Sequence, residues 1–288
     1  MFPKVLDYHK PNKPLVPNGL GVLYVLTSAA YLFLLDYLGV VKTSHDVSLA
    51  LTLAVCILFG GFMGLLDDWM DLRWRYKAFF PLIAVIPLVT LATRLGLRTS
   101  MTLPFLGSIH FDPVVYYFIV LPLFVTIATN TVNMLGGLNG LETVCPSIVL
   151  IGLMILAGPN AVLLYVPLIM WLVLAFLNFQ GKLFVGNTGS FAIGITLASF
   201  ATISDLKVSL IISLSPYILN SMLILLTYFV WRSKASISFA EGKLSSEHRR
   251  SLVTLVTYRH HLTERQVVVI MSLLFVASTS VALILQTL

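Results

Sequence analysis

Long apolar runs constrain this chain more than any other feature of its sequence. A helix that crosses a bilayer needs about 20 predominantly apolar residues, and we identify nine stretches that fit, none with a charge near its middle. Hydrophobic residues make up 58% of the 288 positions and charged residues only 10%, too much apolar surface for a soluble fold to cover. We therefore expect an all-α, polytopic helical membrane protein with about nine transmembrane helices, forming one domain over residues 1–288. The predicted spans are residues 19–41, 47–66, 78–95, 113–135, 143–158, 160–178, 189–204, 207–231 and 266–287.

Two of these assignments depend on turn and kink residues. The run from Thr143 to Asn178 is too long for one crossing, and Gly158, Pro159 and Asn160 provide turn chemistry at its centre. It is predicted to form a tight hairpin of two spans. Pro216 lies within the eighth span, where it predicts a kink.

Basic residues are distributed unequally between the two sets of loops. Because nine spans place the termini on opposite sides, the loops can be sorted and compared. One set holds fourteen of the eighteen Lys and Arg residues, and the other keeps only Lys42, Arg94, Arg98 and Lys207. The positive-inside rule places the first set in the cytoplasm. A basic inner face would attract anionic lipids and phosphate-bearing ligands, although membrane insertion alone also explains it. The basic set comprises residues 1–18, 67–77, 136–142, 179–188 and 232–265.

The first polar cluster follows the second span, where Asp67, Asp68 and Asp71 lie within five residues. Carboxylates this close persist only if they are solvated, share protons, or are neutralised by basic groups or a divalent metal. If the helix continues, Asp67 and Asp71 share a face and form a metal-binding or general-base edge. A solvated helix end, with the basic residues between positions 73 and 77 as counterions, is the alternative.

The second cluster combines amides and glycines. Asn130 and Asn133 lie on one face of a predicted helix, and Gly136, Gly137 and Gly140 follow. Amides at membrane depth either pair with neighbouring helices or line a wet site, and the glycines would let a ligand approach the backbone. Helix packing alone remains an alternative explanation.

The third cluster is a loop of small residues, Phe184–Ser190, directly before an apolar helix. A tight loop of this kind presents backbone N–H groups that can bind an anion. Thr188 or Ser190 could equally act as an ordinary N-cap.

The fourth cluster lies in the longest predicted cytoplasmic loop, 232–265, which contains His248–Arg250 and Tyr258–His261. Guanidinium and imidazole groups suit recognition of a diphosphate. A basic surface facing lipid is the alternative, and the bare His pair lacks a third zinc ligand at a recognisable spacing.

Taken in this order and on one side of the membrane, the clusters resemble the polyprenyl-phosphate N-acetylhexosamine-1-phosphate transferase family. The resemblance covers nearly the whole chain, although no single motif is specific. It rests on the Lys/Pro-rich opening Lys10–Pro17, the Asp67-Asp68 pair with Lys77, the Asn130/Asn133 segment, the Phe184–Ser190 loop and the His260-His261 pair.

The sequence after Asn133 separates branches of this family. Bacterial peptidoglycan-type members usually have Asp-Gly-x-Asp-Gly there, whereas this chain has Gly136–Glu142. That pattern is similar to the archaeal and eukaryotic enzymes that use UDP-GlcNAc and dolichyl phosphate. The resemblance implies transfer of GlcNAc-1-phosphate from UDP-GlcNAc to a polyprenyl phosphate, with release of UMP. A phospho-MurNAc-pentapeptide-type or other UDP-HexNAc transferase, and a membrane transporter or flippase, are the alternatives.

The resemblance also implies residue roles. Asp67 would act as a base or phosphate-positioning group, with Asp68 supporting the electrostatics of the site, or the two residues would exchange these roles. Mg²⁺, or alternatively Mn²⁺, would be bound by Asn133 and Asn187. No nucleic-acid partner is expected, and a homodimer is left open. The implied substrate-binding residues are Lys77, Asn130, Asn139, Glu142, Arg259, His260 and His261.

Two features depart from the family pattern. Members commonly have ten spans, with one helix ahead of the Lys/Pro-rich segment at which this chain begins. The loop motif usually contains Asp where this chain has Asn187, and a neutral amide is a weaker magnesium ligand than a carboxylate. A catalytically impaired family member that serves as a binding or assembly subunit is therefore a further hypothesis.

Overall fold

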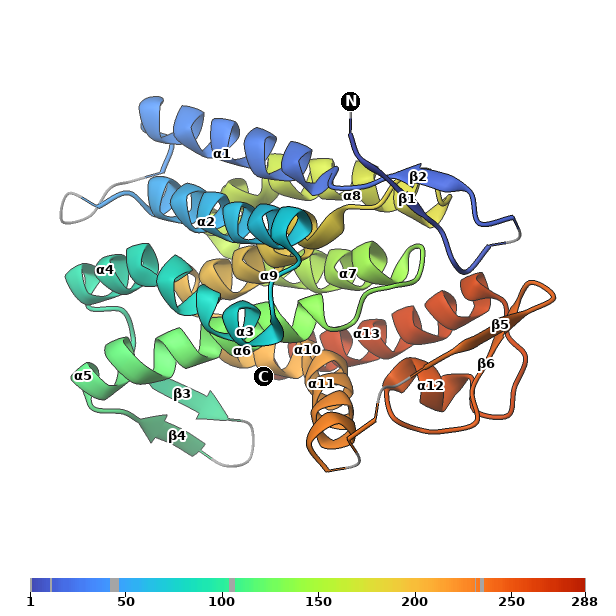
Figure 1. The fold of residues 1–288 in the computed structure, drawn as a ribbon. Coiled ribbons are helices and arrows are strands. Elements are labelled where there is room, and N and C mark those ends of the chain that lie inside the picture. Colours follow the sequence, from blue (N-terminus) through green and yellow to red (C-terminus); the bar gives the residue numbers. More distant parts are fainter. Residues whose placement is uncertain are drawn as a thin grey trace.

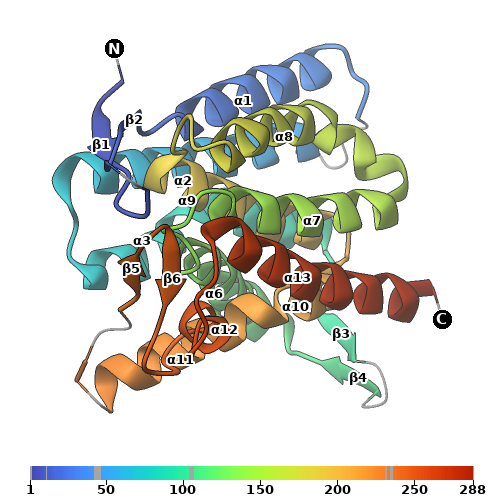
Figure 2. The ribbon, with the colours of Figure 1, turned by 90° about the vertical axis from the view of Figure 1, so that its right-hand side faces the viewer.

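Apolar helices packed side by side make up the body of the protein (Figures 1 and 2). The structure, a computed structural model, describes residues 2–10, 12–41, 47–103, 107–230, 232–233 and 236–287. Lys42 and Lys234, both used in the charge comparison, and Pro11 of the opening motif lie outside these ranges. The helices are α1 (Gly21–Tyr37), α2 (Leu49–Met70), α3 (Trp74–Ala84), α4 (Ile86–Leu95), α5 (Pro113–Val115), α6 (Leu121–Asn133), α7 (Leu141–Leu156), α8 (Tyr165–Phe179), α9 (Gly186–Ile203), α10 (Lys207–Ser213), α11 (Ser215–Phe229), α12 (Leu252–Val256) and α13 (Glu264–Thr287), with a π-helical segment η1 (Tyr116–Val120) and a 3₁₀ segment η2 (Gly158–Leu164).

The predicted class is confirmed: this is a helical, multi-pass membrane protein. Among the described residues, five helical segments are long and apolar enough to cross a membrane, and a sixth is counted if α10 and α11 form one broken span. Helices α1 and α7 are apolar but shorter. The long segments are Leu49–Met70, Trp74–Leu95, Pro113–Asn133, Gly158–Phe179 and Glu264–Gln286.

The predicted turn and kink are also present. Segment η2 begins at Gly158 and joins α7 to α8, which pack against each other as a hairpin. Helices α10 and α11 are bent by 59° with respect to each other, and Pro216 lies in the first turn of α11. Proline lacks the N–H that would continue the helical ladder, which explains a break at this position.

Helix α9 forms the centre of the bundle, since every residue from Thr188 to Ile203 is buried. It packs against α1, α2 and α6, and small residues bring the backbones close together, as is typical of membrane helices. A Cβ added to Gly64 of α2 would overlap the Asn187 carbonyl oxygen, and one added to Gly21 of α1 would overlap the Gly189 backbone. The position of the α9 N-terminus is therefore set by backbone contact with two neighbouring helices.

Three antiparallel hairpins occupy the loops: β1 (Lys4–Leu6) with β2 (Leu15–Pro17), β3 (Ser100–Leu103) with β4 (Gly107–His110), and β5 (Ser238–Ala240) with β6 (Lys243–Ser245). In both ribbon views, β1–β2 and β5–β6 lie towards one end of the bundle and β3–β4 towards the other (Figures 1 and 2). The β1–β2 and β5–β6 hairpins belong to loops of the basic set.

Replacing Gly64 with alanine tests the backbone contact between α2 and α9. The added methyl group would push the helices apart, so we expect the free energy of unfolding in detergent to fall by about 1–3 kcal/mol. The control is Leu65→Ala, because Leu65 is 48% exposed on the neighbouring face of α2. Equal stability of the two variants would contradict the packing described.

Candidate active site

Asp68, in the last turn of α2, binds the first turn of α9. Its Oδ1 accepts a hydrogen bond from the backbone N–H of Asn187 (2.9 Å), and its Oδ2 accepts from the backbone N–H (2.9 Å) and hydroxyl (2.7 Å) of Thr188. A carboxylate at a helix N-terminus satisfies donors that have no partner within the helix and is favoured by the helix dipole. The expectation that Thr188 or Ser190 caps this helix is wrong, because the cap comes from α2, 119 residues earlier.

Gly186 allows Asp68 to approach the backbone at the start of α9. Gly186, the first residue of α9, has a φ of +70°, and a Cβ at this position would lie only 2.7 Å from Asp68 Oδ2. The Asn187 side chain is half-buried, and it is the backbone N–H of this residue that binds Asp68. The anion-binding loop predicted from the sequence thus binds an anion of the protein itself.

Asp67 forms a buried ion pair with Lys77, at the start of α3. The Lys77 Nζ lies 2.8 Å from Asp67 Oδ1, which also accepts the Leu72 N–H at 3.1 Å. The Asp67 side chain is 1% exposed, whereas that of Lys77 is 27% exposed. Asp67 Oδ2 is buried without a hydrogen-bond donor among the described residues. One oxygen of this carboxylate is therefore held by lysine and a backbone N–H, and the other has no donor among the described residues.

The expected edge formed by Asp67 and Asp71 is absent from the described structure. Helix α2 ends at Met70, and Asp71 adopts a left-handed conformation that closes the helix with its N–H on the Asp67 carbonyl oxygen. The Asp71 side chain is exposed, while that of Asp67 is buried. Of the three carboxylates, Asp67 and Asp68 contact neighbouring helices, whereas Asp71 is exposed.

The two asparagines of α6 contact different neighbours. The Asn130 amide donates to the carbonyl oxygens of Thr126 (3.0 Å) and of Ala78 in α3 (3.4 Å), next to Lys77. Asn133 Oδ1 accepts a hydrogen bond from the Ser190 hydroxyl of α9 at 2.9 Å. Asn133 thus joins the α9 side of the site, whereas Asn130 holds α3 in place. Ser190, which lies in the small-residue loop, was not predicted as a partner of Asn133.

Glu142 interacts with Ser190 and Asp68 near the α9 N-terminus. It belongs to the first turn of α7, ahead of the predicted span that begins at Thr143. Burial raises the pKa of its carboxyl from the ordinary value to about 7, and the negative charge of Asp68 acts in the same direction, while the Ser190 hydroxyl opposes the shift. Glu142, Asp68 and Ser190 therefore form one electrostatic unit around the α9 N-terminus.

The other predicted substrate-binding residues form no hydrogen bond or ion pair with this unit among the described residues. Asn139 is buried and bonded to Asp7 and Glu264. Arg259, His260 and His261 are exposed in the segment between α12 and α13. Among the described residues, no hydrogen bond or ion pair connects that segment to Asp67, Asp68 or Lys77.

A stacked arrangement in this basic segment was not apparent from the sequence. The guanidinium of Arg249 lies 4.2 Å from the centre of the Tyr258 ring, and that of Arg259 lies 5.2 Å from the same centre. Cation–π contacts of this kind restrain flexible arginine side chains. Two positive charges are thus held near one tyrosine.

Comparison of the sequence with known proteins identifies its family. Residues 18–205 match the family described as glycosyl transferase family 4. The chain belongs to this family. The match includes the Asp67–Lys77 pair and the α9 N-terminus, while the Arg259–His261 segment lies beyond it.

Within glycosyl transferase family 4, similar proteins occur in archaea, eukaryotes and bacteria. A protein of Saccharolobus solfataricus is 31% identical over 98% of this chain and 87% of its own length, and one of Sulfolobus acidocaldarius is 29% identical over 88% and 78%. Both are named putative UDP-N-acetylglucosamine–dolichyl-phosphate N-acetylglucosaminephosphotransferases. A phospho-N-acetylmuramoyl-pentapeptide-transferase of Synechococcus is 30% identical over 54% of this chain and 48% of its own length.

The Asp67–Lys77 pair can be tested by a double-mutant cycle. Lys77→Met leaves the Asp67 charge buried without its partner, so we expect a loss of about 1–3 kcal/mol in the free energy of unfolding, reduced by the partial exposure of Lys77. Adding Asp67→Asn removes the charge and should restore part of the loss. Additive effects in the double variant, measured by unfolding in detergent, would contradict the pairing.

Proposed function

We propose that this protein transfers GlcNAc-1-phosphate from UDP-GlcNAc to a polyprenyl phosphate of the dolichyl type, giving polyprenyl-diphosphate-GlcNAc and UMP. This would be the first membrane step in assembling a lipid-linked glycan for protein N-glycosylation. The observation that carries the proposal is the buried Asp67–Lys77 pair beside the capped N-terminus of α9, in a chain that matches GlcNAc-phosphotransferases along nearly its whole length.

The chemistry of this reaction suits the residues present. The lipid phosphate is already an oxyanion near neutral pH, so the main difficulty is to bring two polyanions together. Lys77 is oriented by Asp67 and would contact a phosphate through its partly exposed ammonium. Arg259, His260 and His261 would contact the diphosphate or the sugar, with Tyr258 restraining the Arg259 guanidinium. Asn130, Asn139 and Glu142 would support substrate binding through hydrogen bonds.

The residues around Asp67 also fit a divalent cation. The buried Asp67 Oδ2 has no donor among the described residues, and Asn133 Oδ1 accepts a hydrogen bond from Ser190 in the first turns of α9, so carboxylate and amide oxygens, which a hard cation prefers, are both present. We propose that Asn133 and Asn187 hold Mg²⁺, with Asp67 close by, and that Mn²⁺ can substitute. When bound, the ion would screen the phosphate charges. Asp68 would act indirectly, by fixing the backbone of Asn187.

The membrane location follows from the same chemistry. A lipid phosphate lies at headgroup depth while its chain remains in the hydrocarbon, so polar residues are needed at one boundary only. The Lys- and Arg-rich loops support a cytoplasmic orientation of the site in the cell membrane. A transporter would instead be expected to place functional polar groups near the midplane or along a path open to both sides.

UMP release tests this function. Purified protein supplied with Mg²⁺, polyprenyl phosphate and UDP-GlcNAc is expected to release UMP, and Lys77→Met is expected to slow release by about 10²–10³-fold, as for loss of one charge-stabilising group. Replacing UDP-GlcNAc with UDP-MurNAc-pentapeptide should abolish release. A preference for the pentapeptide substrate would favour the muramoyl alternative, and solute uptake into liposomes without UMP release would favour a transporter.

Asn187→Asp tests the departure at the α9 loop. An added carboxylate should bind Mg²⁺ more tightly than the amide, so we expect the Mg²⁺ concentration for half-maximal UMP release to fall roughly tenfold. Because the Asn187 contact to Asp68 uses its backbone N–H, the variant keeps that bond. Activity that appears only in the variant would identify the natural chain as an impaired family member, and an unchanged Mg²⁺ requirement would argue against Asn187 as a ligand.

A further inference from the structure

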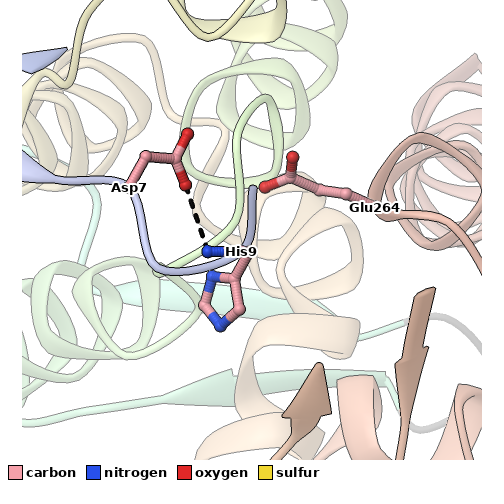
Figure 3. Close-up of side chains that lie close together, drawn as sticks. All are labelled: Asp7, His9 and Glu264. Atoms are coloured by element: carbon pink, nitrogen blue, oxygen red, sulfur yellow. Dashed lines mark hydrogen bonds between the residues drawn. The ribbon is translucent and has the colours of Figure 1, made fainter. Parts of the chain in front are cut away.

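A second polar cluster lies where the β1–β2 connection meets the start of α13. Asp7, His9 and Glu264 each offer a ligand atom, and these atoms all lie within 4.8 Å of one another. Figure 3 shows the Asp7 and Glu264 carboxylates on either side of His9, whose backbone N–H donates to Asp7 Oδ1 and whose imidazole ring points away from both carboxylates. Asn139, from the loop before α7, joins the two carboxylates. Three segments far apart in the sequence thus converge on one group, which we name the N-terminal cluster (Asp7, His9, Lys10, Asn139 and Glu264).

Hydrogen bonds fix the orientation of Asn139. Its Nδ2 donates to Asp7 Oδ2 (2.8 Å) and to Glu264 Oε1 (3.0 Å), and its backbone N–H also donates to Glu264 Oε1 at 2.6 Å. Because carboxylates only accept, the amide cannot be reversed without losing these bonds. The remaining atom, Asn139 Oδ1, is buried without a donor among the described residues, in a side chain that is only 3% exposed. A buried acceptor of this kind is costly unless something binds it.

The N-terminal cluster already attracts a cation. The Lys10 ammonium lies 3.3 Å from Asp7 Oδ2, and Asp7 is only 2% exposed. This ammonium lies where a Cβ on residue 181 would be, and the space is open because residue 181 is glycine. Asn139 Oδ1 lies 3.5 Å from that Cβ position. The Lys10 side chain is 28% exposed and can swing into solvent. The ammonium therefore marks a position where positive charge is stabilised and from which lysine can be displaced.

We propose that the N-terminal cluster is a binding site for a divalent transition-metal ion, with Asp7, His9 and Glu264 as ligands, the Asn139 carbonyl oxygen as the fourth, and Lys10 as a displaceable competitor. Two carboxylates, an imidazole and an amide oxygen form a mixed oxygen–nitrogen set, which suits Zn²⁺ or Mn²⁺ better than Mg²⁺. Ligand bonds to Zn²⁺ are about 2.0–2.2 Å, so the ligand atoms must draw closer on binding, and the half-buried His9 ring must turn towards the two carboxylates.

The N-terminal cluster differs from the Asp67–Lys77 pair and the Asp68 cap, although Asn139 is also one of the proposed substrate-binding residues. It shares no residue with the Asp67–Lys77 pair or the Asp68 cap, and within the described ranges no hydrogen bond or ion pair links the two groups. A bound ion would fasten the N-terminal hairpin to the starts of α7 and α13, and so would order the segments that border the predicted substrate-binding loops.

The site is tested by titrating metal-stripped, full-length protein in detergent with Zn²⁺, in the presence of excess Mg²⁺ to saturate magnesium sites. We expect calorimetry to show one Zn²⁺ per chain. His9→Ala removes a ligand and should weaken binding at least about tenfold, whereas Lys10→Met removes the competing cation and should tighten it. Asp67→Asn is the matched control and should leave Zn²⁺ binding unchanged.

Protein integrity is checked by thermal unfolding without metal, where His9→Ala should match the natural chain. Glu264→Gln provides a second ligand variant that keeps an acceptor for Asn139, so weakened Zn²⁺ binding in it cannot be attributed to loss of that hydrogen bond. The proposal is overturned if no Zn²⁺ binds, if His9→Ala and Glu264→Gln bind like the natural chain, or if Lys10→Met weakens binding.

Discussion

The Asp68 carboxylate holds together the two helices on which the site depends. Its three hydrogen bonds to Asn187 and Thr188 fasten the last turn of α2 to the first turn of the central helix, and hydrogen bonds to a charged group contribute about 1.5–3 kcal/mol each. The same turn of α2 carries Asp67, whose pairing with Lys77 brings in α3. Because adjacent carboxylates repel each other, each needs its own partners. The structure supplies helix donors to one and an ammonium to the other.

The different partners of Asp67 and Asp68 separate the roles of two adjacent carboxylates that the sequence alone could only treat as a pair. Asp67 retains a buried oxygen without a donor among the described residues, so it is the carboxylate suited to contact substrate or metal. Both Asp68 oxygens accept hydrogen bonds from the first turn of α9, so we propose for Asp68 a positioning role. The substitution of Asn187 for the family's usual Asp also becomes easier to understand, because the backbone of residue 187 is held by Asp68 whichever side chain it carries.

The fold was largely predictable because hydrophobic length is a local property of the chain. Each of the nine predicted spans overlaps helical structure among the described residues, but only five or six segments there are long and apolar enough to cross a membrane; α1 and α7 are shorter, and α9, predicted as a span over 189–204, is not among the candidates. The hairpin at Gly158 and the kink at Pro216 follow from turn and proline chemistry. Long-range pairing was not predictable. Sequence spacing cannot show that Asp68 caps a helix 119 residues away, or that Asn139 joins Asp7 to Glu264. Asp71 was misplaced for a related reason: a left-handed residue ended α2 where a continuing helix was assumed.

The central claim is that a sugar phosphate, and not the sugar alone, moves from a nucleotide to a lipid at this one-sided site. The most direct test uses UDP-GlcNAc labelled separately at its two phosphorus atoms, with polyprenyl phosphate, Mg²⁺ and purified protein. We predict that the β-phosphorus label enters the organic phase with the lipid while the α-phosphorus label stays in water as UMP. Recovery of both labels as water-soluble UDP, with GlcNAc on the lipid, would contradict it.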